Sequence, residues 1–373
     1  MAKVPSIWPI EPHTQAKHAL LAGYLDAWYP ILASRNRRIV IIDGFAGPGI
    51  YAGGEPGSPR IALERLISHT AFASMNATQF VFLFNEQDPV RHASLAQSIA
   101  ELQQNHTPWP SNVVLAVEGK DFQLLAQDLL AGLGGKAMAP TFAFLDPFGY
   151  RDVPIELVRD LVAFNQSELF IYFDYNSVNR FATAGVVDHH FDALFGTNEY
   201  RAAPPAGARG RGAFLHDLYK RQLHTICGFP YVQSFEMVNS SGHTGNYLFF
   251  CTRHLKGFDR MKAVMWKIDP LGGYRFSDLL AGQEVLFQPD VDTRPLQSAL
   301  AGEFGGRTIS IEDVTNFVVG HTPYTSSHVK TRTLRPMQLA GVISSPNQTR
   351  TGQFPPGTMV AFRASGMKEG ETR

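Results

Sequence analysis

The sequence has few cysteines, no net charge and no long apolar run, and each of these absences excludes a class of protein. Only two of the 373 residues are cysteine, too few for a cysteine metal cluster, so we expect no metal site. A pair at that spacing, Cys227 and Cys251, needs no disulfide in a large core, which indicates a reducing compartment. Basic and acidic residues number 33 each, so any contact with nucleic acid or an anionic membrane must be local.

Apolar segments are short throughout the chain. No stretch reaches the roughly eighteen consecutive apolar residues that a transmembrane helix needs. The opening segment, MAKVPSIWPIEPHTQAKH, lacks the continuous apolar centre of a signal peptide. We therefore expect a soluble, cytoplasmic protein.

Strand and helix signals alternate through the first half of the sequence. Apolar residues recur at helical spacing over 16–34, and further helical stretches separate the strand signals. The strand signals are continuous apolar runs, as is typical of parallel strands covered on both faces. The runs are RIVIIDG, QFVFLFNEQD, NVVLAVEGKDF, TFAFLDPFGY and ELFIYFDYNS. This alternation predicts an α/β fold with a doubly wound, Rossmann-like sheet.

The composition divides the chain into a large and a small predicted domain. Residues 1–290 are expected to contain the sheet, with 176–244 as a mostly helical elaboration. Residues 300–363 show two helical stretches followed by two strands joined by a loop, an order that indicates a winged-helix domain. Residues 364–373 are polar, and we expect a disordered tail.

Glycines follow the first predicted strand at once, in the segment DGFAGPG. Glycine has no Cβ, so Gly47 and Gly49 would let the backbone approach a ligand, although a tight turn also explains them. The next helix begins only at Pro59, whereas dinucleotide folds pass from such glycines directly into a helix. The carboxylate of Asp43 disfavours phosphate and suits a sulfonium or ammonium group. S-adenosylmethionine (SAM) therefore fits better than NAD, an NAD-dependent enzyme remains the weaker alternative, and no Walker motif is present.

Acidic residues end the other predicted strands, at the edge where open α/β sheets bind ligands. Glu86 is placed to accept both hydroxyl groups of a ribose, while Asp121 and Phe122 could face an adenine. The predicted cofactor-binding residues are Asp43, Phe45, Ala46, Gly47, Gly49, Glu86, Asp121 and Phe122.

Several of these segments resemble known families. DGFAGPG looks like motif I of class I SAM-dependent methyltransferases, and LDPFGY resembles the Asp-Pro-Pro-Tyr/Phe motif IV of nucleic-acid amino-methyltransferases. More closely, DGFAGPGIYAGGEPGSPRIALE, FLFNEQD, LDPFGY and HTPYTSSHVKTRTLRPMQLAGVI resemble the three-Cys-motif partner (TcmP) family, from about residue 15 to residue 363. This resemblance implies a bacterial protein encoded beside a radical-SAM-like protein with three cysteines, which would be its partner. It implies no particular substrate.

The motif IV resemblance assigns candidate catalytic residues. In amino-methyltransferases, the aspartate and the carbonyl of the following proline accept hydrogen bonds from the target amine, and an aromatic residue stacks on the base. Asp146 and Pro147 match this pattern, but Phe148 replaces the second proline and Gly149 stands where an aromatic residue is expected. Phe148 or Tyr150 could provide the stacking surface. The alternative is a strand-to-helix turn with a capping aspartate.

The predicted winged helix carries a modest basic set. Lys330, Arg332 and Arg335 lie on its second helix and Arg350 on the loop, where they suit phosphate contacts. Docking to a protein is the alternative for this domain.

Two functions from different classes are consistent with these features. The first is a SAM-dependent methyltransferase acting on an amino group of nucleic acid, which the predicted pocket with Asp146 at its mouth favours. The second is a non-catalytic SAM-binding or nucleic-acid-binding partner protein, which the altered motif IV favours.

Overall fold

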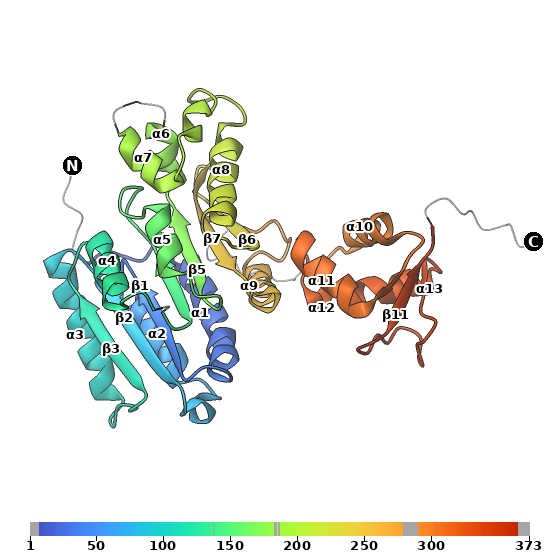
Figure 1. Cartoon of the computed structure of the whole chain (residues 1–373), viewed down its shortest axis with the longest axis horizontal. Coiled ribbons are helices and arrows are strands. Elements are labelled where there is room, and N and C mark those ends of the chain that lie inside the picture. Colours follow the sequence, from blue (N-terminus) through green and yellow to red (C-terminus); the bar gives the residue numbers. More distant parts are fainter. Residues whose placement is uncertain (1–6, 137, 183–184, 186, 279–289, 365–373) are drawn as a thin grey trace, which may run out of the picture. The chain divides into compact units, whose positions relative to one another are not determined.

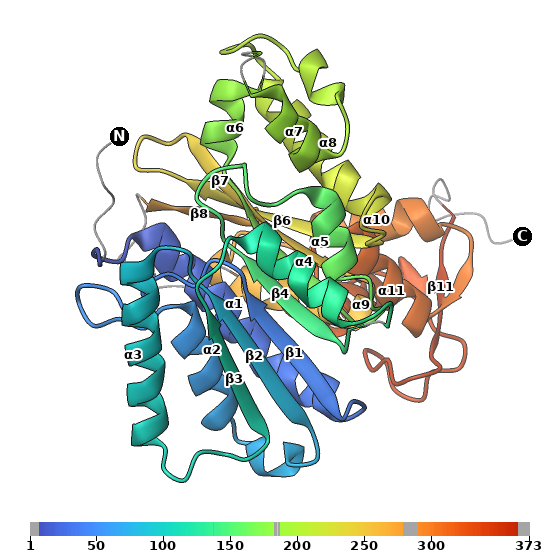
Figure 2. The ribbon, with the colours of Figure 1, turned by 60° about the vertical axis from the view of Figure 1, so that its left-hand side comes forward.

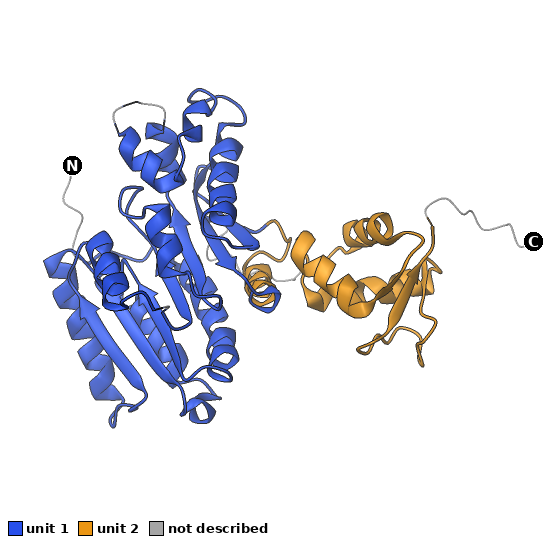
Figure 3. Ribbon diagram, in the orientation of Figure 1, with its two compact units in different colours: residues 1–257, 274–283 blue, residues 258–273, 284–373 orange. Residues whose placement is uncertain are grey.

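The computed structural model describes residues 7–136, 138–182, 185, 187–278 and 290–364. The chain forms two compact units, coloured separately in Figure 3. Unit 1 comprises residues 1–257 and 274–283, and unit 2 comprises residues 258–273 and 284–373. The tail predicted at 364–373 lies outside the described residues except for Ala364.

Unit 1 is built on an eight-stranded sheet with the strand order β3-β2-β1-β4-β5-β7-β6-β8 (Figure 1). The first five strands are mutually parallel, whereas β7 runs antiparallel to both β5 and β6. The strands are β1 (Arg38–Asp43), β2 (Gln79–Asn85), β3 (Val113–Glu118), β4 (Thr141–Leu145), β5 (Glu168–Phe173), β6 (Tyr231–Val238), β7 (Thr244–Thr252) and β8 (Arg275–Ser277). The five predicted strands and the mixed α/β class are confirmed.

Helices cover both faces of this sheet. In Figure 2, α4 and α5 lie in front of β4, whereas α1 and α2 lie behind β1 and β2. Contacts link α1 to α2 and α2 to α3, and a second series links α4 to α5, α5 to α7 and α7 to α8. The helices of unit 1 are α1 (Pro12–Ala33), α2 (Ser58–Ile67), α3 (Pro89–Asn105), α4 (Phe122–Gly132), α5 (Ile155–Leu161), α6 (Tyr175–Phe181), α7 (Asp188–Phe195) and α8 (Arg211–Thr225), with short 3-10 turns η1 (Phe72–Met75) and η2 (Glu199–Ala202).

Aromatic side chains fill the interface between α1 and the sheet. Tyr24 and Trp28 of α1 pack on Phe142 of β4, and Tyr29 packs on Phe80 of β2. All five rings are buried, so the predicted amphipathic helix serves as a cover for the parallel strands.

The strand register gathers the strand ends at one edge. Asp43 at the end of β1 pairs with Phe84 of β2 and Phe144 of β4, so the loops after these strands begin side by side. Strand β1 lies between β2 and β4. The strands β2 and β3 lie on one side of β1, and the later strands β4 and β5 lie on its other side. This is the switch point at which open α/β sheets bind ligands.

The segment 176–244 contains helices α6, α7 and α8, but it also contains strand β6, which the sequence reading missed. β6 mixes buried and half-buried positions, because it belongs to an antiparallel hairpin near the edge of the sheet. It therefore lacks the continuous apolar run by which the parallel strands were predicted.

Unit 2 contains most of α9 (Leu255–Ile268), from Phe258 onward, together with further helices and a three-stranded antiparallel sheet with the order β10-β11-β9. Apolar side chains from α10, α11, α12, α13 and the strands form its core. Its elements are α10 (Arg294–Phe304), β9 (Thr308–Ser310), α11 (Ile311–His321), α12 (Ser326–Val329), the π-helical turn η4 (Lys330–Leu334), α13 (Arg335–Leu339), β10 (Ile343–Ser344) and β11 (Met359–Phe362). The sequence reading found the later helices and both last strands but missed α10 and β9.

No helix in the described part of the chain combines the length and apolar character needed to cross a bilayer.

Candidate functional site

Asp43 is the last residue of β1 and is buried, and the glycine-rich loop follows it directly. Its side chain is only 3% exposed, so its oxygens need partners within the chain. Ser58, at the start of α2, donates its hydroxyl proton to Asp43 Oδ2 at 2.6 Å, and the backbone nitrogen of Phe45 donates to Oδ1 at 3.3 Å. The carboxylate thus joins the end of β1 to both ends of the long loop between β1 and α2.

Burial makes the charge of Asp43 costly. It raises the pKa of this carboxyl to about 7, and the negative charges of Asp146 and Glu86 act in the same direction, against the hydrogen bonds from Ser58 and Phe45. Three carboxyl groups therefore lie close enough to repel one another. Glu86 pairs with Arg91 and Asp146 pairs with Lys17, so Asp43 is the member of this group whose charge a bound cation would balance.

The three loop glycines are required for different reasons. A Cβ on Gly44 would strike Phe122 and Leu145 at 2.7–2.8 Å, and a Cβ on Gly49 would press on Leu95 and Ser98, so both permit close packing. Gly47 has a φ of +65° and no atom within 4 Å of the position of a Cβ. Its missing side chain therefore leaves open space, as a ligand cradle requires.

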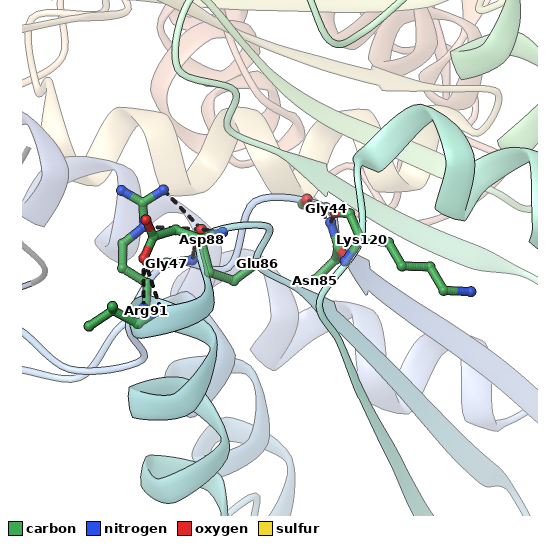
Figure 4. A network of polar contacts seen from close by, with 8 residues as sticks. Gly44, Gly47, Asn85, Glu86, Asp88, Arg91 and Lys120 are labelled. Atoms are coloured by element: carbon green, nitrogen blue, oxygen red, sulfur yellow. Dashed lines mark hydrogen bonds and ion pairs between the residues drawn. The ribbon is translucent and has the colours of Figure 1, made fainter. Parts of the chain in front are cut away.

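Glu86 follows β2 and is tied into a network of hydrogen bonds (Figure 4). Its Oε1 accepts from the backbone nitrogen of Asp88 at 2.9 Å and from the guanidinium of Arg91 at 2.9 and 3.0 Å. Its Oε2 accepts from the backbone nitrogen of Gly47 at 3.1 Å, which fixes the carboxylate to the glycine loop. An oxygen that accepts a single bond can take one more, so Oε2 can still receive a ligand hydroxyl.

Asn85, buried at the end of β2, links the loops on either side. Its amide group donates to the carbonyl oxygens of Gly44 and Lys120, and its oxygen accepts from the backbone nitrogen of Lys120, as Figure 4 shows. Ala46 in turn donates its backbone N–H to the Asn85 carbonyl. These bonds set the spacing of the loops after β1, β2 and β3.

A hollow of about 180 Å³ opens between these loops. Phe45 and Phe122 lie beside each other with ring centroids 5.0 Å apart, and both line the hollow. Asp121 caps α4 by accepting two backbone N–H groups on Oδ1, and it also lines the hollow. The remaining lining residues are Gly44, Asn85, Glu86, Gln87, Arg91, Phe148 and Asp152.

Asp146 follows β4 and forms an ion pair that the sequence reading did not foresee. Lys17 Nζ of α1 donates to Asp146 Oδ2 at 2.5 Å. The same Nζ lies 4.4 Å from the centroid of the Tyr172 ring, in a cation–π contact. Lys17 is only 7% exposed, so Asp146 binds an amine of its own chain inside the protein.

Phe148 projects from the loop after β4 at the mouth of the hollow. Its ring is 63% exposed and lies between Trp8, at a centroid distance of 6.3 Å, and the guanidinium of Arg91, at 5.4 Å. Pro147 beside it is buried. The suggestion that Tyr150 offers a stacking surface is wrong, because this ring is buried and stacks on Phe191 at 4.5 Å.

The four residues predicted to contact phosphates, Lys330, Arg332, Arg335 and Arg350, are all exposed, and they lie at different places on unit 2. Lys330 lines a depression beside α11, whereas Arg332 lines another with Trp266 and Lys267 of α9. Arg335 lies within 3.1 Å of where a Cβ of Gly352 would be, next to the loop that carries Arg350. Arg350 therefore lies in the loop between β10 and β11, and Arg335 lies beside that loop.

Sequence reasoning missed Lys17, Arg91 and Ser58. Lys17 could have been noticed, because it lies four residues before Leu21 and seven before Tyr24, on the buried face of the helix. Ser58 stands at the start of α2, and its hydroxyl binds Asp43. Nothing in the sequence predicts that Arg91 pairs with Glu86 instead of pointing into solvent.

Among the described residues, no group of three His, Cys, Asp or Glu side chains is arranged to hold a metal ion.

Comparisons with known proteins give only distant likenesses. No family model matches the chain, and no curated protein matches it. Three solved structures are similar at 11% identity: the Legionella pneumophila protein LPL1258 (TM-score 0.38; 63% of this chain and 84% of that one), human methyltransferase-like protein 13 in complex with SAH (0.33; 67% and 91%) and Trm1 from Pyrococcus horikoshii with S-adenosyl-L-methionine (0.36; 96% and 93%). At TM-scores of 0.33–0.38, these likenesses assign no activity to this chain.

Proposed function

We propose that unit 1 binds S-adenosylmethionine in the hollow at the ends of β1, β2 and β3. The open space at Gly47, whose backbone nitrogen donates to Glu86 in the lining of the hollow, carries this proposal. SAM is a cationic ligand with a ribose and an adenine, and it would supply a transferable methyl group. Glu86 Oε2 would take a ribose hydroxyl, the Phe45 ring, packed on Phe122, would offer an apolar surface to the adenine, and the carboxylate of Asp43 would balance the positive charge of the ligand.

We propose further that the protein transfers a methyl group to an amine held by Asp146 and the Pro147 carbonyl. An amine that donates its N–H bonds to these oxygens directs its lone pair away from them. Phe148, exposed at the mouth of the hollow, offers a flat apolar surface against which a substrate ring can stack.

Nucleic acid is the polymer that we propose as the carrier of this amine. The order β9, α11, then α12 to α13, then the β10–β11 pair supports the winged-helix interpretation of unit 2. Arg335 and Arg350, together with Lys330 and Arg332, would contact phosphates.

The resemblance to the three-Cys-motif partner family leads us to propose a radical-SAM-like protein with three cysteines as the partner. Association of the two purified proteins, measured by light scattering, tests this proposal.

A non-catalytic role is the second candidate, and the ion pair between Lys17 and Asp146 favours it. An aspartate already neutralised by a buried lysine is a weaker acceptor for a substrate amine. In that role the protein would bind SAM or nucleic acid for its partner without transferring methyl groups.

Methyl transfer from isotopically labelled SAM to DNA and RNA distinguishes the two candidates. Asp146→Asn is the informative variant, because it removes the charge while keeping a hydrogen-bonding side chain beside Lys17. Catalysis predicts SAM binding within a few-fold of the original protein and turnover reduced by about 10²-fold or more. Labelling that is equally fast in Asp146→Asn would remove Asp146 from the mechanism.

A further inference from the structure

Lys17 occupies the place at which the proposed function puts the acceptor amine. Its Nζ donates to Asp146 Oδ2 at 2.5 Å, the same kind of bond by which a substrate amine would be held. An inference about Lys17 rests on that proposed function, because the function assigns Asp146 to the acceptor. A primary amine fixed at this oxygen by its own chain is an internal candidate for methylation.

The ammonium group of Lys17 lies beside an aromatic ring and several carboxylates. The Tyr172 ring faces Nζ at 4.4 Å. Burial raises the pKa of Tyr172 well above its usual range, and the charges of Asp146, Asp174 and Glu11 add to this rise, so three carboxylates lie near this ring. A cation is stabilised there both by the ring and by the acids.

The neighbouring His18 adds no competing charge. Burial, followed by the charge of Lys17, lowers the pKa of His18 to about 3, so the imidazole is neutral at physiological pH. Lys17 is therefore the cation that balances Asp146 directly. The chain offers a contrast in the exposed pair between Lys120 Nζ and Asp128, at 2.8 Å, which has the same charges without burial.

We propose that Lys17 is a methyl acceptor of its own site. Lys17 Nζ passes one proton to Asp146 across their hydrogen bond and gains a lone pair. That lone pair forms a bond to the methyl carbon of a sulfonium donor, while the carbon–sulfur bond breaks and its electrons remain on sulfur as a thioether. The positive charge moves from sulfur to the methylated nitrogen, and Asp146 releases its proton to solvent and pairs again with the lysine.

The test is the mass of the Lys17 peptide after the full-length protein has been incubated with SAM, compared with incubation with S-adenosylhomocysteine. We expect one or more methyl groups on Lys17 and none on Lys120. Lys17→Arg keeps the positive charge beside Asp146 but has no primary amine, so its peptide should gain no mass. Asp146→Asn should methylate Lys17 about 10²-fold more slowly or worse, because it accepts no proton.

A chemical control distinguishes methylation by the protein's own site from methylation that depends only on how exposed a lysine is. Reductive methylation with formaldehyde and a borane reagent modifies accessible lysines without using the protein's site. We expect it to modify Lys120 quickly and the buried Lys17 slowly, the reverse of the order with SAM. The same order with both reagents would overturn the proposal.

Calorimetry with SAM on the same preparation separates two kinds of failure. If SAM binds and Lys17 stays unmodified, the inference is wrong while the proposed methyltransferase function stands. If SAM does not bind at all, both are wrong.

Discussion

The carboxylate of Asp43 and the hydroxyl of Ser58 meet inside the protein at 2.6 Å, and this bond closes the loop that carries the three glycines. The two residues stand fifteen positions apart, at the end of β1 and the beginning of α2. The bond keeps the glycine loop in place while leaving the carboxyl group poised between its two protonation states, since the pKa of Asp43 is about 7.

Affinity for a cationic ligand should therefore depend on pH. A cation beside Asp43 favours the carboxylate, so binding below pH 7 must displace a proton and should weaken by up to about tenfold per pH unit. Above pH 8 the affinity should level off. Calorimetric titration with SAM between pH 5.5 and 8.5 in buffers of different ionisation enthalpy measures both the affinity and the proton release. Asp43→Asn should flatten the profile, and an unchanged profile would contradict this account.

The stability of the unliganded protein should respond to Asp43 in the opposite direction. The raised pKa means that the folded chain holds one more proton than the unfolded chain between about pH 4 and pH 7. Stability contributed by this group therefore falls as pH rises through that window. Asp43→Asn should remove this part of the pH dependence in urea unfolding, whereas Asp128→Asn, at an exposed carboxylate, should leave it unchanged.

Lys262 should give unit 2 a pH dependence of its own. This buried lysine donates to the carbonyl oxygens of Val319 and Thr322 at the end of α11, and burial lowers its pKa to about 7. Between pH 7 and about 10.5, the unfolded chain carries the extra proton, so stability should rise with pH by at most about 1.4 kcal/mol per pH unit. Fluorine NMR of fluorotryptophan at Trp266, the only tryptophan in unit 2, follows this unit. Lys262→Met should abolish the rise, and a slope that persists in Lys262→Met would contradict the assignment.

A buried network between α1 and the sheet should be sensitive to the loss of one hydroxyl. Glu168 accepts from the hydroxyls of Tyr24 at 2.5 Å and Thr252 at 2.6 Å, and it is buried. Tyr24→Phe leaves a carboxylate oxygen without its donor and should cost about 1–3 kcal/mol at pH 8. Tyr29→Phe is the matched control, because that hydroxyl donates to a neutral carbonyl, of Ala62, and its loss should cost about 1 kcal/mol. Equal losses in urea unfolding would show that the charge of Glu168 is irrelevant.

The basic residues of unit 2 predict a salt-dependent affinity for nucleic acid. Each phosphate that the protein no longer neutralises should reduce the slope of log affinity against log salt by about 0.9 for duplex DNA. Removing Arg335 and Arg350 together should therefore reduce the slope by about 1.8, and removing Lys330 and Arg332, which line separate depressions, should reduce it by a similar amount. Fluorescence anisotropy with a labelled duplex at several salt concentrations measures this. Binding that is indifferent to salt would point to a protein partner instead.

The sequence was most informative where the fold imposes a simple rule. Parallel strands covered on both faces must be apolar throughout, so the five runs ending near Asp43, Glu86, Glu118, Asp146 and Asp174 were found, and their ends had to meet at one edge. β6 was missed because it belongs to an antiparallel hairpin, whose strands need not be apolar at every position.

The residues of the site that were missed depend on contacts between distant segments. Lys17 and Asp146 are 129 positions apart, and nothing near Asp146 in the sequence indicates a lysine partner. The glycines looked equivalent in sequence, yet their different tasks follow from the neighbours supplied by α3, α4 and β4. Such information exists only once the segments are packed.

Gly47 and Gly54 allow the most direct test of the central claim, that the open space at Gly47 holds SAM. Both have positive φ, +65° and +90°, and neither has an atom within 4 Å of where a Cβ would stand, so alanine strains the backbone at both positions without a steric clash. Calorimetric titration of Gly47→Ala and Gly54→Ala with SAM separates ligand space from backbone strain. The account predicts that Gly47→Ala loses SAM binding while Gly54→Ala keeps it. Equal affinity in the two variants, or no SAM binding by the original protein, would contradict the account.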